Sequence, residues 1–321
     1  MTDSSSVAAT SVLAARRSVT ERTQRAYAAD WQRFITWCSV MDLSPMPAGS
    51  ETLARYVQHL AAKGKSVATV ERALTAVASA HIEHDEQPPL RLAANDALRT
   101  YAHEQAEVLT ARRASPVTVS VLRAMLATCS SERAIGIRDR ALLVLGFATG
   151  ARRSELAALD ISDVTEIPTG LEVAVGNGRY RRNPRLPYGG NPDTCPVRTM
   201  RAWRDLLREN GYLEGPLFVR VDRHGYLGHC ASGAGGSDGR LSDRGVANVV
   251  ARCAHRAGLD PEACWSGHSL RRGMTVETYR TGADPVSIAQ HGGWQSGSRA
   301  LHANFSPPEG WTANPLLGVD L

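Results

Sequence analysis

The sequence predicts a mainly α-helical protein with a small β-sheet, divided into a helical N-terminal domain and a mixed α/β domain. Three observations support this prediction. Apolar residues recur at the 3.6-residue period of a helix through about the first hundred residues. Apolar and other residues alternate with period two over 171–175, which is typical of a strand. The length of 321 residues favours two domains, at roughly 100–200 residues per domain.

The N-terminal domain is expected to be a unit of four helices. Ser18 and Glu21 form a capping-box pattern, which opens a first helix with one apolar face. Pro45 and Pro47 end this segment, and a second helix is expected over 50–62. A third begins at Ser66, and a fourth follows the next pair of prolines. Short polar turns join the four helices, as in helical bundles.

The second domain is expected to follow a basic linker. Its predicted helices cover 117–128, 138–159, 196–209, 243–257, 268–281 and 285–290. The strand over 171–175 leads into an arginine-rich hairpin over 176–188. The predicted organisation is a flexible tail (1–17), a helical domain (18–109), a linker (110–117), a second domain (118–310) and a C-terminal tail (311–321).

The composition is that of a soluble globular protein with a basic balance. Hydrophobic residues make up 43% and charged residues 21%, which excludes a disordered or fibrous chain. No apolar run is long enough for a membrane span and MTDSSS is no signal peptide, so we expect a cytoplasmic protein. The net charge of +5 permits a nucleic-acid partner without establishing one. Lysine is scarce, since Lys63 and Lys65 are the only two among the 37 basic residues.

The sequence predicts neither a metal site nor a cofactor. Its six cysteines include no CxxC pair, and the cluster of His224, His229 and Cys230 matches no zinc spacing. The glycine-rich stretch GAGGSDGR beside that cluster lacks the GK[ST] ending of a phosphate loop.

Three separated segments of the second domain favour a common site. The first is TGARRSEL at 149–156, which follows the apolar segment ALLVLGFA. The second is HSLR, in which the three-residue spacing of His268 and Arg271 places both side chains on one helix face. The third is Gly292-Gly293-Trp294.

Arginines and a histidine in one place suit a phosphodiester. Guanidinium groups bind phosphate oxygens in pairs and keep their charge, so Arg152 and Arg271 can stabilise a pentacovalent transition state. His268 can donate or accept a proton. Glu155, three residues after Arg152, can orient that arginine. Taken alone, each fragment is more often a solvated surface charge.

Together the three segments resemble the tyrosine recombinase family, which includes the phage integrases, the Xer proteins and Cre. TGARRSEL, HSLRRG and GGW are similar to that family's motifs in sequence and order, and the resemblance extends over about Ser18 to Trp311. It implies a helical, SAM-like core-binding domain followed by a recombinase catalytic domain. It also implies a site-specific recombinase or integrase that works on duplex DNA as a tetramer, without metal or nucleotide, through a covalent 3′-phosphotyrosine.

The resemblance assigns a role to each motif residue. Arg152 and Arg271 would bind the scissile phosphate and His268 would be the acid/base partner. Trp294 would bond to or pack against the phosphate through its indole, and Glu155 would support Arg152.

Two positions depart from the family's pattern. The nucleophilic tyrosine follows the third motif by about nine residues, where Ala303 stands here and has no atom able to attack phosphorus. A shifted register reaches Asn304 or Phe305, and no tyrosine follows Tyr279. The second departure is the hairpin lysine that protonates the leaving oxygen, since Asn177 takes its place.

The basic residues around these motifs are expected to bind the DNA backbone. The hairpin candidates Arg179, Arg181, Arg182 and Arg185 are alternatively a solvated basic turn. Further candidates are Arg25, Lys63, Lys65, Arg72, Arg112 and Arg113. The two departures leave open a second function on the same fold: a catalytically inactive DNA-binding regulator, or a subunit beside an active recombinase.

Overall fold

The computed structural model describes residues 21–105, 114–178, 181–228, 238–295 and 299–302. The chain divides into two compact units, Met1–Ala111 and Arg112–Leu321. The predicted tails and residues 110–113 of the predicted linker lie outside the described residues, so the domain limits given above stay predictions.

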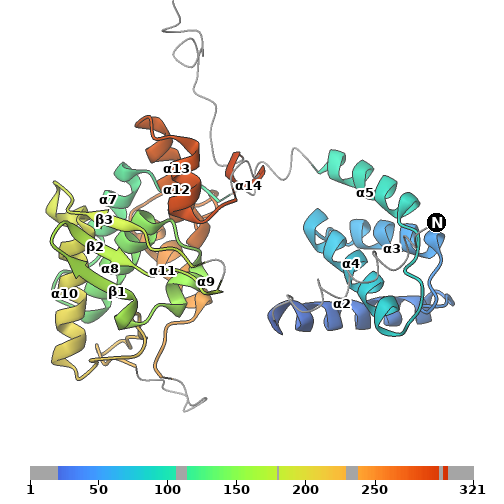
Figure 1. Cartoon of the computed structure of the whole chain (residues 1–321), viewed down its shortest axis with the longest axis horizontal. Helices are drawn as coiled ribbons and strands as arrows, with labels where there is room; N and C mark the ends of the chain where they lie inside the picture. The colour runs from blue at the N-terminus through green and yellow to red at the C-terminus, as the bar shows by residue number, and fades with distance from the viewer. Residues whose placement is uncertain (1–20, 106–113, 179–180, 229–237, 296–298, 303–321) are drawn as a thin grey trace, which may run out of the picture. The chain divides into compact units, whose positions relative to one another are not determined.

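The described residues of the first unit form four helices (Figure 1). They are α2 (Glu21–Val40), α3 (Ser50–Ala62), α4 (Val67–Glu83) and α5 (Leu92–Glu104). The hydroxyl of Ser66 caps α4 by accepting a hydrogen bond from the Thr69 N–H at 3.3 Å. Helix α2 packs against α4 and α3 against α5, around the buried rings of Phe34, Trp37 and Tyr56. The predicted helical fold of this unit is confirmed.

The second unit combines helices with a small antiparallel sheet. Its helices are α7 (Val119–Ala127), α8 (Ala134–Thr149), α9 (Arg153–Ala158), α10 (Pro196–Glu209), α11 (Asp243–Arg256), α12 (Gly267–Arg280), α13 (Pro285–Gly292) and α14 (Arg299–His302), with short 3₁₀ turns at Ile161–Asp163 and Pro192–Thr194. The strands β1 (Val164–Ile167), β2 (Gly170–Val173) and β3 (Arg185–Pro187) lie in that order. The hairpin between β2 and β3 was predicted, whereas β1 and α14 were not.

The prediction of one continuous helix over 138–159 is wrong. The chain leaves α8 at Gly150, whose φ of +57° is a left-handed conformation that favours glycine. A Cβ at this position would also collide with the Met274 side chain of α12. Arg152 is extended and starts α9. The helical spacing of apolar residues continues across this break because both helices bury apolar residues, so this pattern does not indicate the turn.

The core of the second unit surrounds α8, which packs against α10 and α12. Helix α8 is buried on nearly all sides, as expected for a helix that is apolar all round. The C-terminus of α8 and the first turn of α12 are therefore fixed by the core. Among the described residues, no helix is both long enough and apolar enough to cross a membrane.

Candidate active site

The turn between α8 and α9 positions the first arginine. The Arg152 N–H donates to Oε2 of Glu155 at 2.8 Å, and its guanidinium Nη1 donates to Oε1 of the same carboxylate at 2.6 Å. Both contacts follow from the position of Arg152 at the N-cap of α9, with Glu155 three residues later. The Arg152 side chain stays 44% exposed, so its orientation is fixed while its outer surface is accessible.

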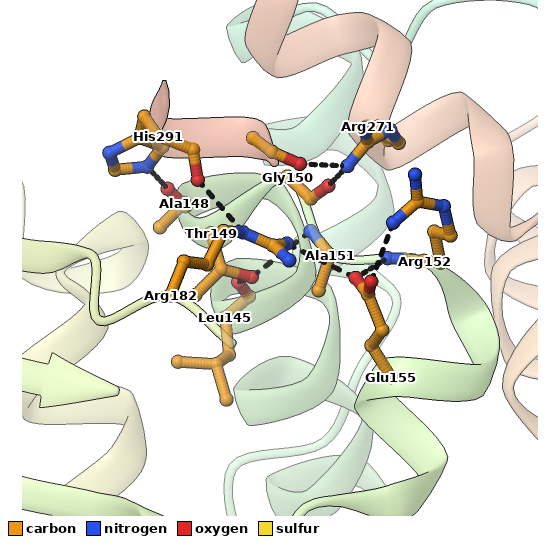
Figure 2. Close-up of polar contacts among 11 residues, drawn as sticks. Leu145, Ala148, Thr149, Gly150, Ala151, Arg152, Glu155, Arg182, Arg271 and His291 are labelled. Carbon is orange, nitrogen blue, oxygen red and sulfur yellow. Dashed lines mark hydrogen bonds and ion pairs between the residues drawn. The ribbon is translucent and has the colours of Figure 1, made fainter. Parts of the chain in front are cut away.

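Helix α12 positions His268 and Arg271 in its first turns. Arg271 is 94% buried, and its Nη1 donates to the carbonyl oxygens of Gly150 and of Gly292, the latter at 2.5 Å (Figure 2). Its guanidinium therefore joins the end of α8 to the end of α13. His268 lies on the exposed side of the same helix.

The third segment, Gly292-Gly293-Trp294, packs against two guanidinium groups. The Arg271 Cζ lies 3.4 Å from the centroid of a Trp294 ring, which is a cation–π contact. A Cβ on Gly292 would collide with the Trp294 ring. A Cβ on Gly293 would lie 2.9 Å from Nη1 of Arg182, and Gly293 itself has a φ of +68°. Both glycines are therefore required by close packing, and Trp294 contacts Arg271 directly.

Arg182 belongs to this site and not to the exposed surface of the hairpin. Its side chain is 9% exposed, its Nη2 donates to Oε2 of Glu155 at 3.1 Å and its Nε donates to the His291 carbonyl at 3.0 Å (Figure 2). The neighbouring candidates remain on the surface. Arg181 is 57% exposed and Arg185 is 77% exposed and paired with Glu172.

The other predicted residues lie apart from this cluster or outside the described chain. Asn177 is exposed in the turn after β2. In the first unit Arg25, Lys63 and Lys65 are exposed. Arg72 is engaged by the buried Asp30, with 2.7 Å between Nε and Oδ2. The predictions for Arg112, Arg113, Arg179 and Ala303 fall outside the described residues.

The electrostatics of the site favour an anion. Desolvation, followed by the positive charges of Arg152 and Arg182, lowers the pKa of Arg271 to about 9, so it stays protonated at neutral pH. Partial desolvation, followed by the charges of Arg153, Arg271 and Arg152, lowers the pKa of the exposed His268, which favours the neutral imidazole. Two guanidinium groups thus contact the Glu155 carboxylate, and that of Arg271 interacts with it only through its charge.

Two nitrogens of this site are buried donors without a partner among the described residues. Nη1 of Arg182 and Nη2 of Arg271 are buried and have no hydrogen-bond partner within the described protein. A buried N–H of a charged group without a partner is costly, so the Nη2 donor of Arg271 suits an oxygen of a ligand. Burial acts to raise the pKa of Glu155, but hydrogen bonds from Arg182 and Arg152 outweigh it and lower this pKa. The carboxylate is therefore ionised at neutral pH and keeps both arginines in place.

The described residues contain no group of three or more His, Cys, Asp or Glu side chains arranged to hold a metal ion. The donors gathered here are guanidinium and imidazole groups. Such groups suit an anion.

Comparison with known proteins assigns the fold and the motifs to a family. The model of the phage integrase family matches residues 116–302, which is more than half of the chain. This chain belongs to the phage integrase family. The resemblance found in its three motifs is confirmed.

Curated relatives of this family member are named as recombinases. An integrase/recombinase XerD homolog of Selenomonas ruminantium is 30% identical over 284 residues, covering 85% of this chain and 78% of that protein. The tyrosine recombinase XerD of Halalkalibacterium halodurans is 27% identical, covering 85% and 83%. The recombinase Cre of Escherichia phage P1 is 23% identical, covering 87% and 82%.

Solved structures of integrases share the fold. The Tn1549 transposon integrase in complex with circular intermediate DNA has a TM-score of 0.61 at 12% identity and covers 95% of each chain. A lambda integrase dimer bound to a core site has a TM-score of 0.60 at 15% identity, covering 97% of this chain and 98% of that one. The expected fold, helical with a small sheet, is confirmed for this family member.

Sequence reasoning missed the place of Arg182 and gave no role to His291, whose Nε2 lies 2.7 Å from the Ala148 carbonyl. A signal for Arg182 was present. Pro184 and Leu186 are buried, whereas Arg181 and Arg185 are exposed. Because strand residues alternate between faces, Arg182 shares the inward face with the two buried residues.

Proposed function

We propose that this protein is a site-specific DNA recombinase of the integrase type, which binds duplex DNA and holds one backbone phosphate between Arg152, Arg271 and His268. The observation that supports this proposal is the buried Nη2 of Arg271, a charged donor with no partner within the described protein. The relatives named as recombinases, and the integrases of the same fold solved with DNA, agree with this ligand.

The geometry suits the electrostatic part of phosphoryl transfer. When an oxygen attacks phosphorus, negative charge grows on the non-bridging oxygens, and rigid guanidinium groups stabilise it without reorganising. Arg271 is held by two carbonyls and Trp294, and Arg152 is held by Glu155. The neutral imidazole of His268 can take up a proton from an attacking hydroxyl or donate a hydrogen bond to the phosphate.

A second candidate function is supported by the sequence after the third motif. Ala303 stands at the nucleophile position of the family's pattern, and no tyrosine follows Tyr279. Asn177 stands at the position of the lysine, and a neutral amide is a poor acid for the leaving oxygen. This candidate is a DNA-binding regulator, or a subunit that fills one place of a tetramer beside an active recombinase.

Further DNA contacts come from exposed basic residues of both units in this proposal. Arg25, Lys63 and Lys65 of the first unit, with Arg181 and Arg185 of the hairpin, are exposed and suit contacts to the backbone. Such contacts position a protein without specifying sequence. The proposal includes assembly as a tetramer on two duplexes and a location in the cytoplasm.

A duplex with a 5′-bridging phosphorothiolate at the phosphate to be cut tests the two candidates. The sulfur leaving group departs without a proton, so a missing general acid does not prevent cleavage and a missing nucleophile does. For the inactive candidate we expect binding but no covalent protein–DNA adduct. An adduct formed by the unaltered protein would refute the inactive candidate, and mapping its site would identify the nucleophile.

Restoring a tyrosine tests the phosphate site independently. Ala303→Tyr, Asn304→Tyr and Phe305→Tyr sample the three registers, and we expect one of them to form the adduct. The same variant with Arg271→Met should form none. If no register forms an adduct although DNA is bound, the arginine cluster does not hold the scissile phosphate. If DNA binding has no salt dependence, both candidate functions fail.

A further inference from the structure

Arg182 lies where three segments of the second unit meet. It comes from the β2–β3 hairpin, where its backbone pairs with Val175. Its side chain contacts Glu155 of α9 and the carbonyl of His291 in α13. Figure 2 shows its guanidinium between the carboxylate on one side and the α13 backbone on the other.

The contact with Glu155 reaches the first phosphate-binding arginine. Oε2 of Glu155 accepts from both the Arg152 N–H and Nη2 of Arg182, while Oε1 accepts from Nη1 of Arg152. The Glu155 side chain is 12% exposed, so water has little access to this pair. The free energy of an ion pair that is this buried depends strongly on its geometry, because water does not solvate one charge when the other moves away.

The contact with α13 reaches the second phosphate-binding arginine. Nε of Arg182 binds the carbonyl of His291, the residue before Gly292, whose own carbonyl accepts from Arg271. Gly293 leaves room for the Arg182 guanidinium, and Trp294 then stacks on Arg271. The end of α13 is thus held from two sides by two guanidinium groups.

We propose that Arg182 is a positioning residue that sets the distance between Arg152 and Arg271 by binding Glu155 and the His291 carbonyl at the same time. A single planar guanidinium can make both contacts because its donors point in fixed, different directions. A lysine ammonium on a flexible stem carries the same charge but has no such fork. This inference rests on the proposed phosphate site and adds a residue that aligns it.

The test measures how strongly one phosphate charge contributes to binding. A neutral methylphosphonate is placed at each phosphate of the bound duplex in turn, and the loss of affinity at each position is measured by fluorescence anisotropy with the full chain. In the unaltered protein we expect one phosphate whose neutralisation weakens binding about 10- to 100-fold, the range of a charge-assisted contact. Arg271→Met should abolish the effect at that phosphate. No such phosphate in the unaltered protein would refute the proposed function itself.

Variants of Arg182 then test the positioning role. In Arg182→Gln and in Arg182→Lys, neutralising that phosphate is expected to weaken DNA binding about threefold or less. Neutralising the other phosphates should weaken binding as much as in the unaltered protein, which shows that the variant chain is folded. Arg208→Gln is the control, since Arg208 also pairs with a carboxylate, that of Asp205, but on the exposed surface of α10. In Arg208→Gln, neutralising that phosphate should weaken DNA binding as much as in the unaltered protein.

Two results would overturn the inference while leaving the phosphate site intact. One is an Arg182→Gln variant in which neutralising that phosphate weakens binding as much as in the unaltered protein. The other is the same result in Arg182→Lys, which would show that a positive charge at this position is enough to align the site. Because Arg182 acts in part through Glu155, the double variant Arg182→Gln with Glu155→Gln should weaken binding by less than the sum of the two single effects. Fully additive effects would contradict this route, and Glu155→Gln carries the test if the Arg182 variants do not fold.

Discussion

Replacing Arg271 with methionine separates the cost of a buried charge from its use in binding. The lowering of the Arg271 pKa to about 9 corresponds to about 5 kcal/mol against the charged form. The methionine removes this cost but leaves the carbonyls of Gly150 and Gly292 without that donor, at about 1–3 kcal/mol each. Because the two terms are similar in size, we expect the free energy of unfolding to change by less than about 2 kcal/mol.

DNA binding should respond much more strongly than stability. Loss of charge-assisted hydrogen bonds worth about 1.5–3 kcal/mol weakens binding about 10- to 150-fold. The slope of log affinity against log salt should fall by about 0.9, the value for one phosphate contact. The assay is an anisotropy titration at several salt concentrations, with thermal unfolding of the same samples. Arg208→Met, at an exposed arginine on α10, should change neither property.

Two results would refute this reasoning. A variant destabilised by more than about 5 kcal/mol would show that Arg271 is chiefly a structural link between α8 and α13, because the loss of its contacts would exceed the gain from removing a buried charge. A variant with unchanged affinity and salt slope would show that its Nη2 does not bind a phosphate.

Three further predictions follow from the same contacts. Gly293→Ala should lower stability and DNA affinity more than Gly282→Ala, because both have positive φ but only the first crowds Arg182; equal effects in melting and binding assays would contradict this. The pKa of His268, followed by NMR, should lie below its ordinary value of 6.5 in the free protein and rise when DNA binds. DNA affinity should therefore increase as pH falls. A pKa that does not change on binding would place the phosphate elsewhere. Glu155→Gln should cost stability at neutral pH, and this difference should vanish as pH falls through the lowered pKa of the carboxyl; a difference that persists in acid would show that charge is not its cause.

Local patterns in the sequence were enough to predict most elements. The hydrogen bond to Ser66, the apolar face of α2 and the prolines in the first turns of α10 and α13 depend on residues a few positions apart. The break at Gly150 was not predicted. The close contact with Met274, which also favours glycine there, joins residues that are distant in sequence.

The sequence by itself determined the helical character of the first unit, the three motifs and the scarcity of lysine, since each depends on residue identity and short-range spacing. The tertiary structure decided how the motif residues meet. It turned Arg182 inward, placed Trp294 on Arg271 and buried one nitrogen of each of these two arginines without a partner within the described protein. These contacts join residues more than twenty positions apart, and the packing of α8, α9, α12 and α13 sets their distances. Helical periodicity contains no information on such distances, because it records which face of an element is buried and not what lies against it.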